Sequence, residues 1–228
     1  MTKPLAIAHR GASGRELENS LAAFRLARTL GADAVEFDVH GTSDGALVVH
    51  HDDAIGRRPI GDLSLAEVRA RTLSNGERVP TLEAALQVIL PDLYAYVEIK
   101  TLDGRWDQQL LATFDASPAP DRIAIHSFDH RIIRRLAEVR PSLPRGVLLS
   151  AYLVDLPHVL EAAQAGTVWQ RWDTIDAGLV ARARGANAEV IAWTVDEPAE
   201  MTRLLQLGVR GLCTNHPERA RHAIDSSS

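Results

Sequence analysis

The chain has 228 residues, 46% of them hydrophobic and 24% charged, which is the balance of an ordinary globular enzyme. No stretch approaches the ~18 consecutive apolar residues of a membrane span, so integral membrane association is not expected. The net charge is −5 and no basic run is present, which argues against a nucleic-acid or anionic-membrane partner.

The beginning of the sequence and its cysteine content bear on the cellular compartment of the protein. Only a few apolar residues precede His9, so the apolar core of a signal peptide is absent. Cys213 is the single cysteine, which excludes an internal disulfide and fits a reducing environment. We therefore expect a cytoplasmic protein with one domain over residues 1–228. The sequence leaves monomer and homodimer open.

Strand and helix patterns alternate along the chain. Short apolar runs predict strands at residues 5–8, 34–39, 47–49, 94–100, 123–127, 146–149, 167–170, 190–195 and 211–214. Helical spacing and capping residues predict helices at residues 21–30, from 62 or 64, from 80 to about 90, at 106–115, 129–139, 157–165, 177–184, 197–207 and 218–224.

About eight strand–helix units without a composition shift indicate parallel strands joined by helical crossovers. No G-x-G-x-x-G or P-loop motif is present, which argues against dinucleotides and nucleoside triphosphates. The length suits a closed barrel, for which ~250 residues is typical. We predict an α/β fold, a (β/α)8 TIM barrel, with a small insertion after the second strand at residues 53–79.

Four glycines follow predicted helices and precede predicted strands. They are Gly31, Gly166, Gly185 and Gly208. Glycine tolerates the left-handed conformation that ends many helices. Each is therefore predicted to be a helix stop.

The segment V-E-F-D-V at residues 35–39 is the most informative one for function. Alternate side chains of a strand point to opposite faces, so Glu36 and Asp38 share one face and three apolar residues share the other. Two buried like charges are costly unless a proton or cation neutralises them. Glu98 in Y-V-E-I-K repeats this pattern and could complete an oxygen site suited to Mg²⁺, Ca²⁺ or Mn²⁺. The alternatives are solvent-facing acids, or an ion pair between Glu98 and Lys100.

Other polar residues fall at strand ends, where a parallel barrel carries its active site. They are His9, Arg10, Lys100, Ser127, Gln170, Trp193, Thr214 and Asn215. His50 and His51 end another strand and must face opposite ways. His40 and His126 also end near this rim and are expected only to line it, whereas Trp193 could belong to the core or to a ligand wall.

In order, the motifs H-R-G, E-N-S, E-F-D, D-G-A-L-V-V-H-H-D, V-P-T-L-E-A-A-L, V-E-I-K, W-T-V and G-L-C-T-N-H-P resemble the glycerophosphodiester phosphodiesterase family over residues 6–217. The resemblance implies a TIM barrel of the phospholipase C-like phosphodiesterase type. It also implies metal-dependent hydrolysis of small-molecule glycerophosphodiesters to sn-glycerol 3-phosphate and an alcohol.

The resemblance also implies roles for individual residues. His9 and His51 correspond to the acid/base pair, and Glu36, Asp38 and Glu98 to the ligands of a divalent metal. Arg10 and Lys100 correspond to phosphate or substrate contacts, and Trp193 to the wall of the glycerol pocket. Which histidine is the acid stays open, as does whether water or the glycerol 2-hydroxyl attacks.

Two departures from the family pattern are visible. Leu17-Glu18-Asn19-Ser20 stands where Pro-Glu-Asn-Thr is usual, and Gly56-Arg57-Arg58-Pro59 replaces a threonine-rich run, which leaves the preferred alcohol open. Competing hypotheses are lysophospholipase D or sphingomyelinase D activity, an aldolase with Lys100 as Schiff base, and a non-enzymatic phosphoryl-ligand binding protein.

Overall fold

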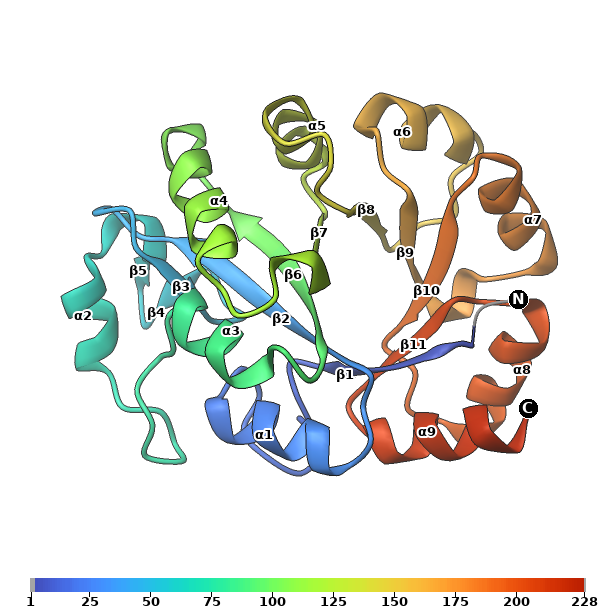
Figure 1. Cartoon of the computed structure of the whole chain (residues 1–228), viewed down its shortest axis with the longest axis horizontal. Helices are drawn as coiled ribbons and strands as arrows, with labels where there is room; N and C mark the ends of the chain where they lie inside the picture. The colour runs from blue at the N-terminus through green and yellow to red at the C-terminus, as the bar shows by residue number, and fades with distance from the viewer. Residues whose placement is uncertain (1–2, 228) are drawn as a thin grey trace.

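The computed structural model describes residues 3–227 and contains a closed parallel barrel (Figure 1). Its strands are β1 (Leu5–His9), β2 (Ala34–Gly41), β6 (Tyr94–Thr101), β7 (Ile123–Ser127), β8 (Arg145–Leu149), β9 (Thr167–Arg171), β10 (Glu189–Trp193) and β11 (Gly211–Thr214). Each pairs in parallel with its neighbours, and β1 pairs with both β11 and β2, which closes the ring. The predicted (β/α)8 fold is confirmed.

Helices surround this ring. They are α1 (Leu21–Thr29), α3 (Leu82–Ile89), α4 (Asp107–Asp115), α5 (His130–Val139), α6 (Leu156–Ala163), α7 (Ala177–Gly185), α8 (Pro198–Leu207) and α9 (Pro217–Ser226). Ser20 caps α1 by accepting a hydrogen bond from the backbone N–H of Ala23 at 3.1 Å, and Thr81 and Asp129 cap α3 and α5 in the same way. Four short 3-10 turns that the sequence did not predict are η1 (Ile60–Asp62), η2 (Gly104–Trp106), η3 (Pro120–Arg122) and η4 (Trp172–Thr174).

The two faces of the barrel wall are buried in separate cores. Outward side chains such as Val35 and Phe37 pack against the helices in a large apolar core. Inside the ring, Trp169, Ile191 and Leu148 belong to a smaller core. Burying each large apolar side chain contributes about 1.5–3 kcal/mol. The alternation predicted for β2 is therefore correct, and its acidic face points into the barrel.

The predicted insertion after β2 is present. β3 (Leu47–Val49) pairs antiparallel with β2, and a small hairpin of β4 (Ala54–Ile55) and β5 (Arg58–Pro59) follows, then α2 (Leu65–Ala70). Val48, Ile60, Leu63, Val68 and Val79 form a core of their own under this segment. The insertion lies beside the carboxyl end of β2, as the left part of Figure 1 shows.

The helix ends follow the glycine prediction only in part. Gly31 and Gly208 have φ of 79° and 85°, so each takes the left-handed conformation that was predicted. The predicted glycine stops after α6 and α7 are wrong, since Gln164 (φ 53°) and Asn187 (φ 56°) take that conformation instead. A side-chain amide residue tolerates this region when the cap hydrogen bonds are made.

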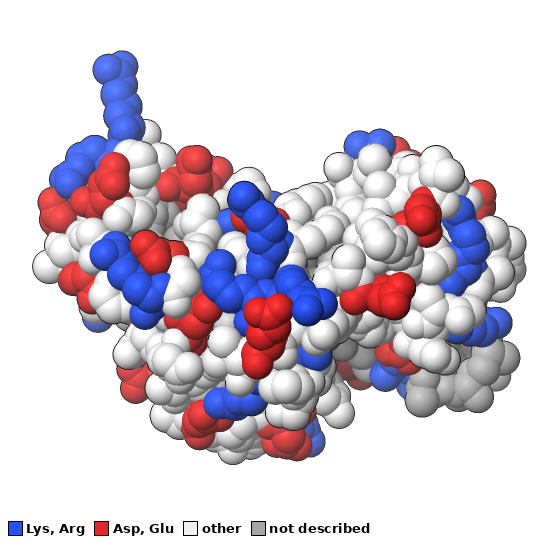
Figure 2. Space-filling model, turned by 90° about the horizontal axis from the view of Figure 1, so that it is seen from above, with Lys and Arg blue, Asp and Glu red and all other residues white. Residues whose placement is uncertain are grey.

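The surface over α4, α5 and α6 carries basic and acidic side chains that are interspersed (Figure 2). On α5, Arg134 lies 2.9 Å from Glu138 and Arg135 lies 2.7 Å from Asp107. These arginines are therefore largely neutralised by neighbouring carboxylates. Among the described residues, no helix has the length and apolar character needed to cross a lipid bilayer.

Candidate active site

Residues predicted from strand ends converge at one end of the barrel. The register sets His9 of β1 beside Glu36 of β2, and Asp38 beside Glu98 of β6. A cavity of about 100 Å³ lies there; its walls include His9, Arg10, Glu36, His51, Glu98, Lys100, His126 and Trp193. Asp38 is buried directly beside these residues and contacts two of them. The barrel thus brings the predicted set together.

The imidazole of His9 is held in one tautomer by its neighbours. Its Nδ1 lies 2.8 Å from Oδ1 of Asn215, whose Nδ2 donates to Asp196 at 2.7 Å. Because the amide nitrogen already donates, the amide oxygen must accept, and His9 Nδ1 carries the hydrogen. The free lone pair is consequently on Nε2, which suits this ring to take up a proton.

Asp196 holds this arrangement in place. Burial opposes its ionisation, but hydrogen bonds from Asn215 and Thr214 keep the pKa of Asp196 below its usual value. The hydroxyl of Ser13 adds a second donor to Oδ1 of Asn215 at 2.8 Å. The orientation of His9 therefore depends on residues from both ends of the chain.

His51 has a different partner. Its Nδ1 lies 2.9 Å from a carboxylate oxygen of Asp52, which accepts a hydrogen bond from the ring. His50 is not part of the cavity wall; its backbone N–H donates to the carbonyl of Asp38, and burial lowers its pKa. The structure therefore resolves the choice between the adjacent histidines in favour of His51 as the one that faces the site.

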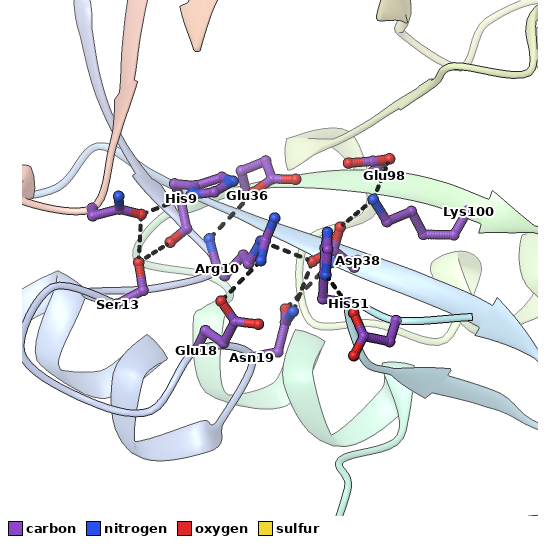
Figure 3. A network of polar contacts seen from close by, with 12 residues as sticks. His9, Arg10, Ser13, Glu18, Asn19, Glu36, Asp38, His51, Glu98 and Lys100 are labelled. Atoms are coloured by element: carbon purple, nitrogen blue, oxygen red, sulfur yellow. Dashed lines mark hydrogen bonds and ion pairs between the residues drawn. The ribbon is translucent and has the colours of Figure 1, made fainter. Parts of the chain in front are cut away.

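Asp38 is surrounded by donors (Figure 3). Arg10 Nε and Lys100 Nζ each lie 3.3 Å from its carboxylate, and Asn19 donates to it at 2.7 Å. Burial alone would raise the pKa of Asp38, but Lys100 and Arg10 keep it below the usual value. The carboxylate orients both cations, and Arg10 is further fixed by Glu18 at 2.8 Å.

Arg10 also has an unusual backbone. Its φ is 55°, in the left-handed region that non-glycine residues seldom occupy. Its backbone N–H donates to Glu36 at 3.2 Å, which ties the turn after β1 to β2. Strained residues of this kind concentrate at functional sites.

Glu36 and Glu98 form a second group with His126. One ligand atom from each of the three lies within 4.8 Å of the others, and all three side chains are buried. Burial and the charge of Asp38 raise the pKa of both Glu36 and Glu98 to about 7. The cause is that carboxylates that share one buried space repel one another when they are ionised. This donor set fits a divalent cation, which would relieve the repulsion.

Several strand-end residues have structural roles instead. Ser127 donates to the carbonyl of Ile99 at 2.6 Å, and Gln170 donates to Thr174 at 2.6 Å. Thr214 donates to Asp196 at 2.8 Å. Trp193 lines the cavity and contacts Phe128 edge-on, with ring centroids 5.6 Å apart; its role as a ligand wall stays a prediction.

The roles of Asn19, Asp196 and Asn215 were not predicted. Asn19 and Asn215 lie in the E-N-S and T-N-H-P motifs, and Asp196 follows W-T-V, so the motifs contained a signal. His126 was expected only to line the rim, and it belongs to no motif that the resemblance used. Its position emerges only from the packing of β7 beside β6.

Comparison with known proteins agrees with this geometry. The model of the glycerophosphoryl diester phosphodiesterase family matches residues 9–219. A glycerophosphodiester phosphodiesterase of Caldanaerobacter subterraneus is 33% identical, over 95% of this chain and 96% of that protein. One from Bacillus subtilis is 27% identical, over 94% and 84% of the two chains.

Solved structures give the same result. A phosphodiesterase of Oleispira antarctica in complex with the product sn-glycerol-3-phosphate has a TM-score of 0.91 at 25% identity, over 98% of this chain and 97% of that one. A glycerophosphodiester phosphodiesterase of Parabacteroides distasonis has a TM-score of 0.89 at 25% identity, over 99% and 98%. The chain belongs to the glycerophosphoryl diester phosphodiesterase family, and the expected enzyme class is confirmed.

Proposed function

We propose that the enzyme hydrolyses glycerophosphodiesters in a metal-dependent reaction that yields sn-glycerol 3-phosphate and an alcohol. The observation that carries the proposal is one cavity with two oriented histidines, two cations and paired buried carboxylates. Phosphodiester hydrolysis needs these groups, because the anionic oxygens must be neutralised, a nucleophile deprotonated and a leaving alkoxide protonated.

We assign a role to each group. Arg10 and Lys100 bind the phosphate oxygens, with Asp38 as the anion that positions both cations. His9, with its free Nε2, takes the proton of the attacking oxygen. His51, paired with Asp52, donates a proton to the leaving oxygen. These assignments rest on the different partners of the two Nδ1 atoms.

A divalent metal would be held by Glu36 and Glu98, because burial opposes the ionisation of both carboxyl groups when no cation is bound. When bound, it supplies charge neutralisation for the phosphate and the nucleophile. Mg²⁺, Ca²⁺ and Mn²⁺ all suit carboxylate ligands. The family resemblance adds Asp38 to the ligands; that role stays a prediction.

Trp193 and Phe128 are proposed to contact the glycerol moiety, since they form one wall of the cavity. The product bound in the Oleispira antarctica relative supports sn-glycerol 3-phosphate as one product of the reaction. The single domain and the cytoplasmic location stay predictions from sequence, and monomer and homodimer both remain compatible with them.

The test is the hydrolysis of glycerophosphocholine and glycerophosphoethanolamine, followed by release of glycerol 3-phosphate. Activity should disappear with a chelator, return with metal, and be lost in His9→Ala and Glu36→Ala. His158→Gln removes an exposed histidine of α6 and should leave the rate unchanged. Hydrolysis that persists in chelator and in both site variants would overturn the mechanism.

The aldolase alternative loses support from the state of Lys100. Burial would lower the pKa of its amine, but Asp38 and Glu98 raise it above the usual value. Schiff-base formation needs a neutral amine. Lys100 is thus held as an ammonium group.

A second candidate substrate class is lysophospholipids, because apolar side chains are exposed at the rim. Phe128, Tyr152 and Val154 follow the adjacent strands β7 and β8 and are 48%, 42% and 90% exposed. An acyl chain would cover such a surface. Cleavage of lysophosphatidylcholine that falls selectively in Val154→Asp, relative to glycerophosphocholine, would support this candidate; an equal effect on both substrates would reject it.

A further inference from the structure

The carboxylate of Glu77 joins the insertion to the first helix of the barrel. Its Oε2 accepts a hydrogen bond from the backbone N–H of Leu21 at 2.9 Å, and its Oε1 accepts one from the backbone N–H of Ala22 at 3.1 Å. These N–H groups begin α1 and have no partner within the helix. Ser20 accepts from the next one, that of Ala23, so Glu77 and Ser20 together satisfy the start of α1.

A tight loop of the insertion holds Glu77 in this position. The backbone N–H of Leu73 donates to the carbonyl of Glu77 at 2.8 Å, which closes the loop. The guanidinium of Arg78, the next residue, donates to two backbone carbonyls at the end of α2 at 3.1 and 2.8 Å. Val79 then enters the small apolar core of the insertion. The carboxylate of Glu77 is therefore carried by a part of the insertion that has contacts on both sides.

Asn19, which directly precedes the cap of α1, reaches into the active site. Its side chain is buried; the nitrogen donates to Oδ2 of Asp38 at 2.7 Å, and the oxygen accepts from the backbone N–H of Asp38 at 3.3 Å (Figure 3). The φ of Asn19 is 55°, in the left-handed region that costs energy for a residue other than glycine. Such a conformation persists only when the surrounding structure holds it. Glu77 supplies the contact on the helix side of this residue, and Asp38 the contact on the barrel side.

The placement of Asn19 affects the two cations of the site. Arg10 Nε and Lys100 Nζ each lie 3.3 Å from the carboxylate of Asp38 that Asn19 contacts. The backbone N–H of Asn19 also donates to the carbonyl of Arg10 at 3.0 Å. A displacement of Asn19 would therefore disturb both Arg10 and the carboxylate that orients it.

We propose that Glu77 is a positioning residue for the phosphate-binding cations: it anchors the start of α1 to the insertion and thereby keeps Asn19 in hydrogen-bond contact with Asp38. This inference rests on the proposed function, in which Arg10 and Lys100 bind the phosphate. Glu77 itself lies outside the cavity wall. The insertion is consequently part of the catalytic unit, because it supplies the anchor on which the geometry of the site depends.

The first test follows the side-chain amide of Asn19 by NMR, in the full chain labelled with ¹⁵N only at asparagine side chains. The chain contains four asparagines, Asn19, Asn75, Asn187 and Asn215, and Asn19→Ala assigns the signal of interest. In Glu77→Ala this signal should shift, and its protons should exchange with solvent about tenfold faster, because a hydrogen bond to a charged group no longer opposes local opening. The signal of Asn187, beyond the end of α7, should stay unchanged.

The second test is the hydrolysis of glycerophosphocholine. Glu77→Ala should lower kcat/KM about 10–100-fold, since small displacements of positioning groups have effects of this size. Glu77→Gln keeps one of the two acceptor oxygens and should fall between Glu77→Ala and the wild type. Glu67→Ala is the matched control, because Glu67 is also an insertion carboxylate at a helix start but accepts from Ser64 of its own helix, at 2.9 Å; it should keep the wild-type kcat/KM.

A double variant separates positioning from a general loss of stability. If Glu77 acts through Asn19, the variant with both Glu77→Ala and Asn19→Ala should be no slower than Asn19→Ala alone. Reductions that multiply in the double variant would overturn the proposal, as would an Asn19 signal that stays unchanged in Glu77→Ala and Glu77→Gln. Glu77→Gln has nearly the wild-type shape and carries both measurements if Glu77→Ala does not fold. A wild type that hydrolyses no glycerophosphodiester would overturn the proposed function, and the Asn19 signal would still decide whether Glu77 holds the site.

Discussion

The side-chain oxygen of Asn215 accepts a hydrogen bond from Nδ1 of His9 at 2.8 Å, while the nitrogen of the same amide donates to Asp196. The amide therefore cannot turn over without breaking its three hydrogen bonds, to His9, Ser13 and Asp196. His51 has a carboxylate in the corresponding position, at 2.9 Å. A neutral partner on one ring and a charged partner on the other give the two histidines different chemistry.

Replacing Asn215 by Leu should lower kcat about 10–100-fold with little change in KM, since the lost tautomer control affects proton transfer, a contribution of 10²–10⁴-fold. Steady-state kinetics on glycerophosphocholine would measure this. Asn75→Leu, in the exposed insertion loop, is the control. A rise in KM alone would instead assign Asn215 to substrate binding.

Arg10→Gln should lower kcat/KM about 10–100-fold, because a hydrogen bond to a charged group is worth about 1.5–3 kcal/mol. Arg10→Lys should recover only part of this, since a lysine cannot reproduce the fork that reaches both Glu18 and Asp38. The exposed Arg105→Gln should behave as wild type. Full activity in Arg10→Lys would show that charge alone suffices.

Without metal, the Glu36→Gln variant should be more stable than the wild type. At pH 8 the folded chain must hold ionised Glu36, whose pKa is raised to about 7 by burial and Asp38, so removing the charge should add on the order of 1–3 kcal/mol to the free energy of unfolding. Urea unfolding in chelator measures this, with exposed Glu83→Gln as control. With saturating metal the order should reverse. Destabilisation of Glu36→Gln in chelator would contradict the repulsion.

His40 should make the protein sensitive to acid. Burial lowers its pKa, so below the ordinary value of about 6.5 the unfolded chain binds a proton that the folded chain does not. Its effect on the free energy of unfolding is absent above about pH 7.5, and stability is lost as pH falls from there toward the folded pKa, by at most about 1.4 kcal/mol per pH unit. His40→Gln should show a flatter curve in urea unfolding from pH 5 to 8. Parallel curves for the two proteins would refute this.

The fold could be predicted from the sequence because local residue patterns determine most of its strands and helices. The alternation of V-E-F-D-V is set by the strand itself, so the buried acidic face of Glu36 and Asp38 could be recognised without a structure. Helix caps are equally local, because each cap side chain accepts a hydrogen bond from a backbone N–H two or three residues later in the chain; these caps are Ser20, Thr81 and Asp129. The end of the strand at Trp193, by contrast, was predicted two residues too late, because Thr194 and Val195 have strand propensity.

Roles that depend on several strands could not be predicted in this way. Ser127 and Gln170 are polar strand-end residues like His9, and only their hydrogen bonds to Ile99 and Thr174 show that they are structural. His126 joins Glu36 through the order of β2, β6 and β7 around the ring. A single strand contains no information about that neighbour.

His9 and Asn215 are 206 residues apart in the sequence, and β1 and β11 are adjacent only in the closed ring. Chains are synthesised from the N-terminus, so earlier segments can fold while the last strand is still being made. In such a nascent barrel His9, the proposed proton acceptor, lacks its orienting amide. We therefore expect activity to require complete translation, so that a chain that stops before β11 is inactive even if most of its helices have formed.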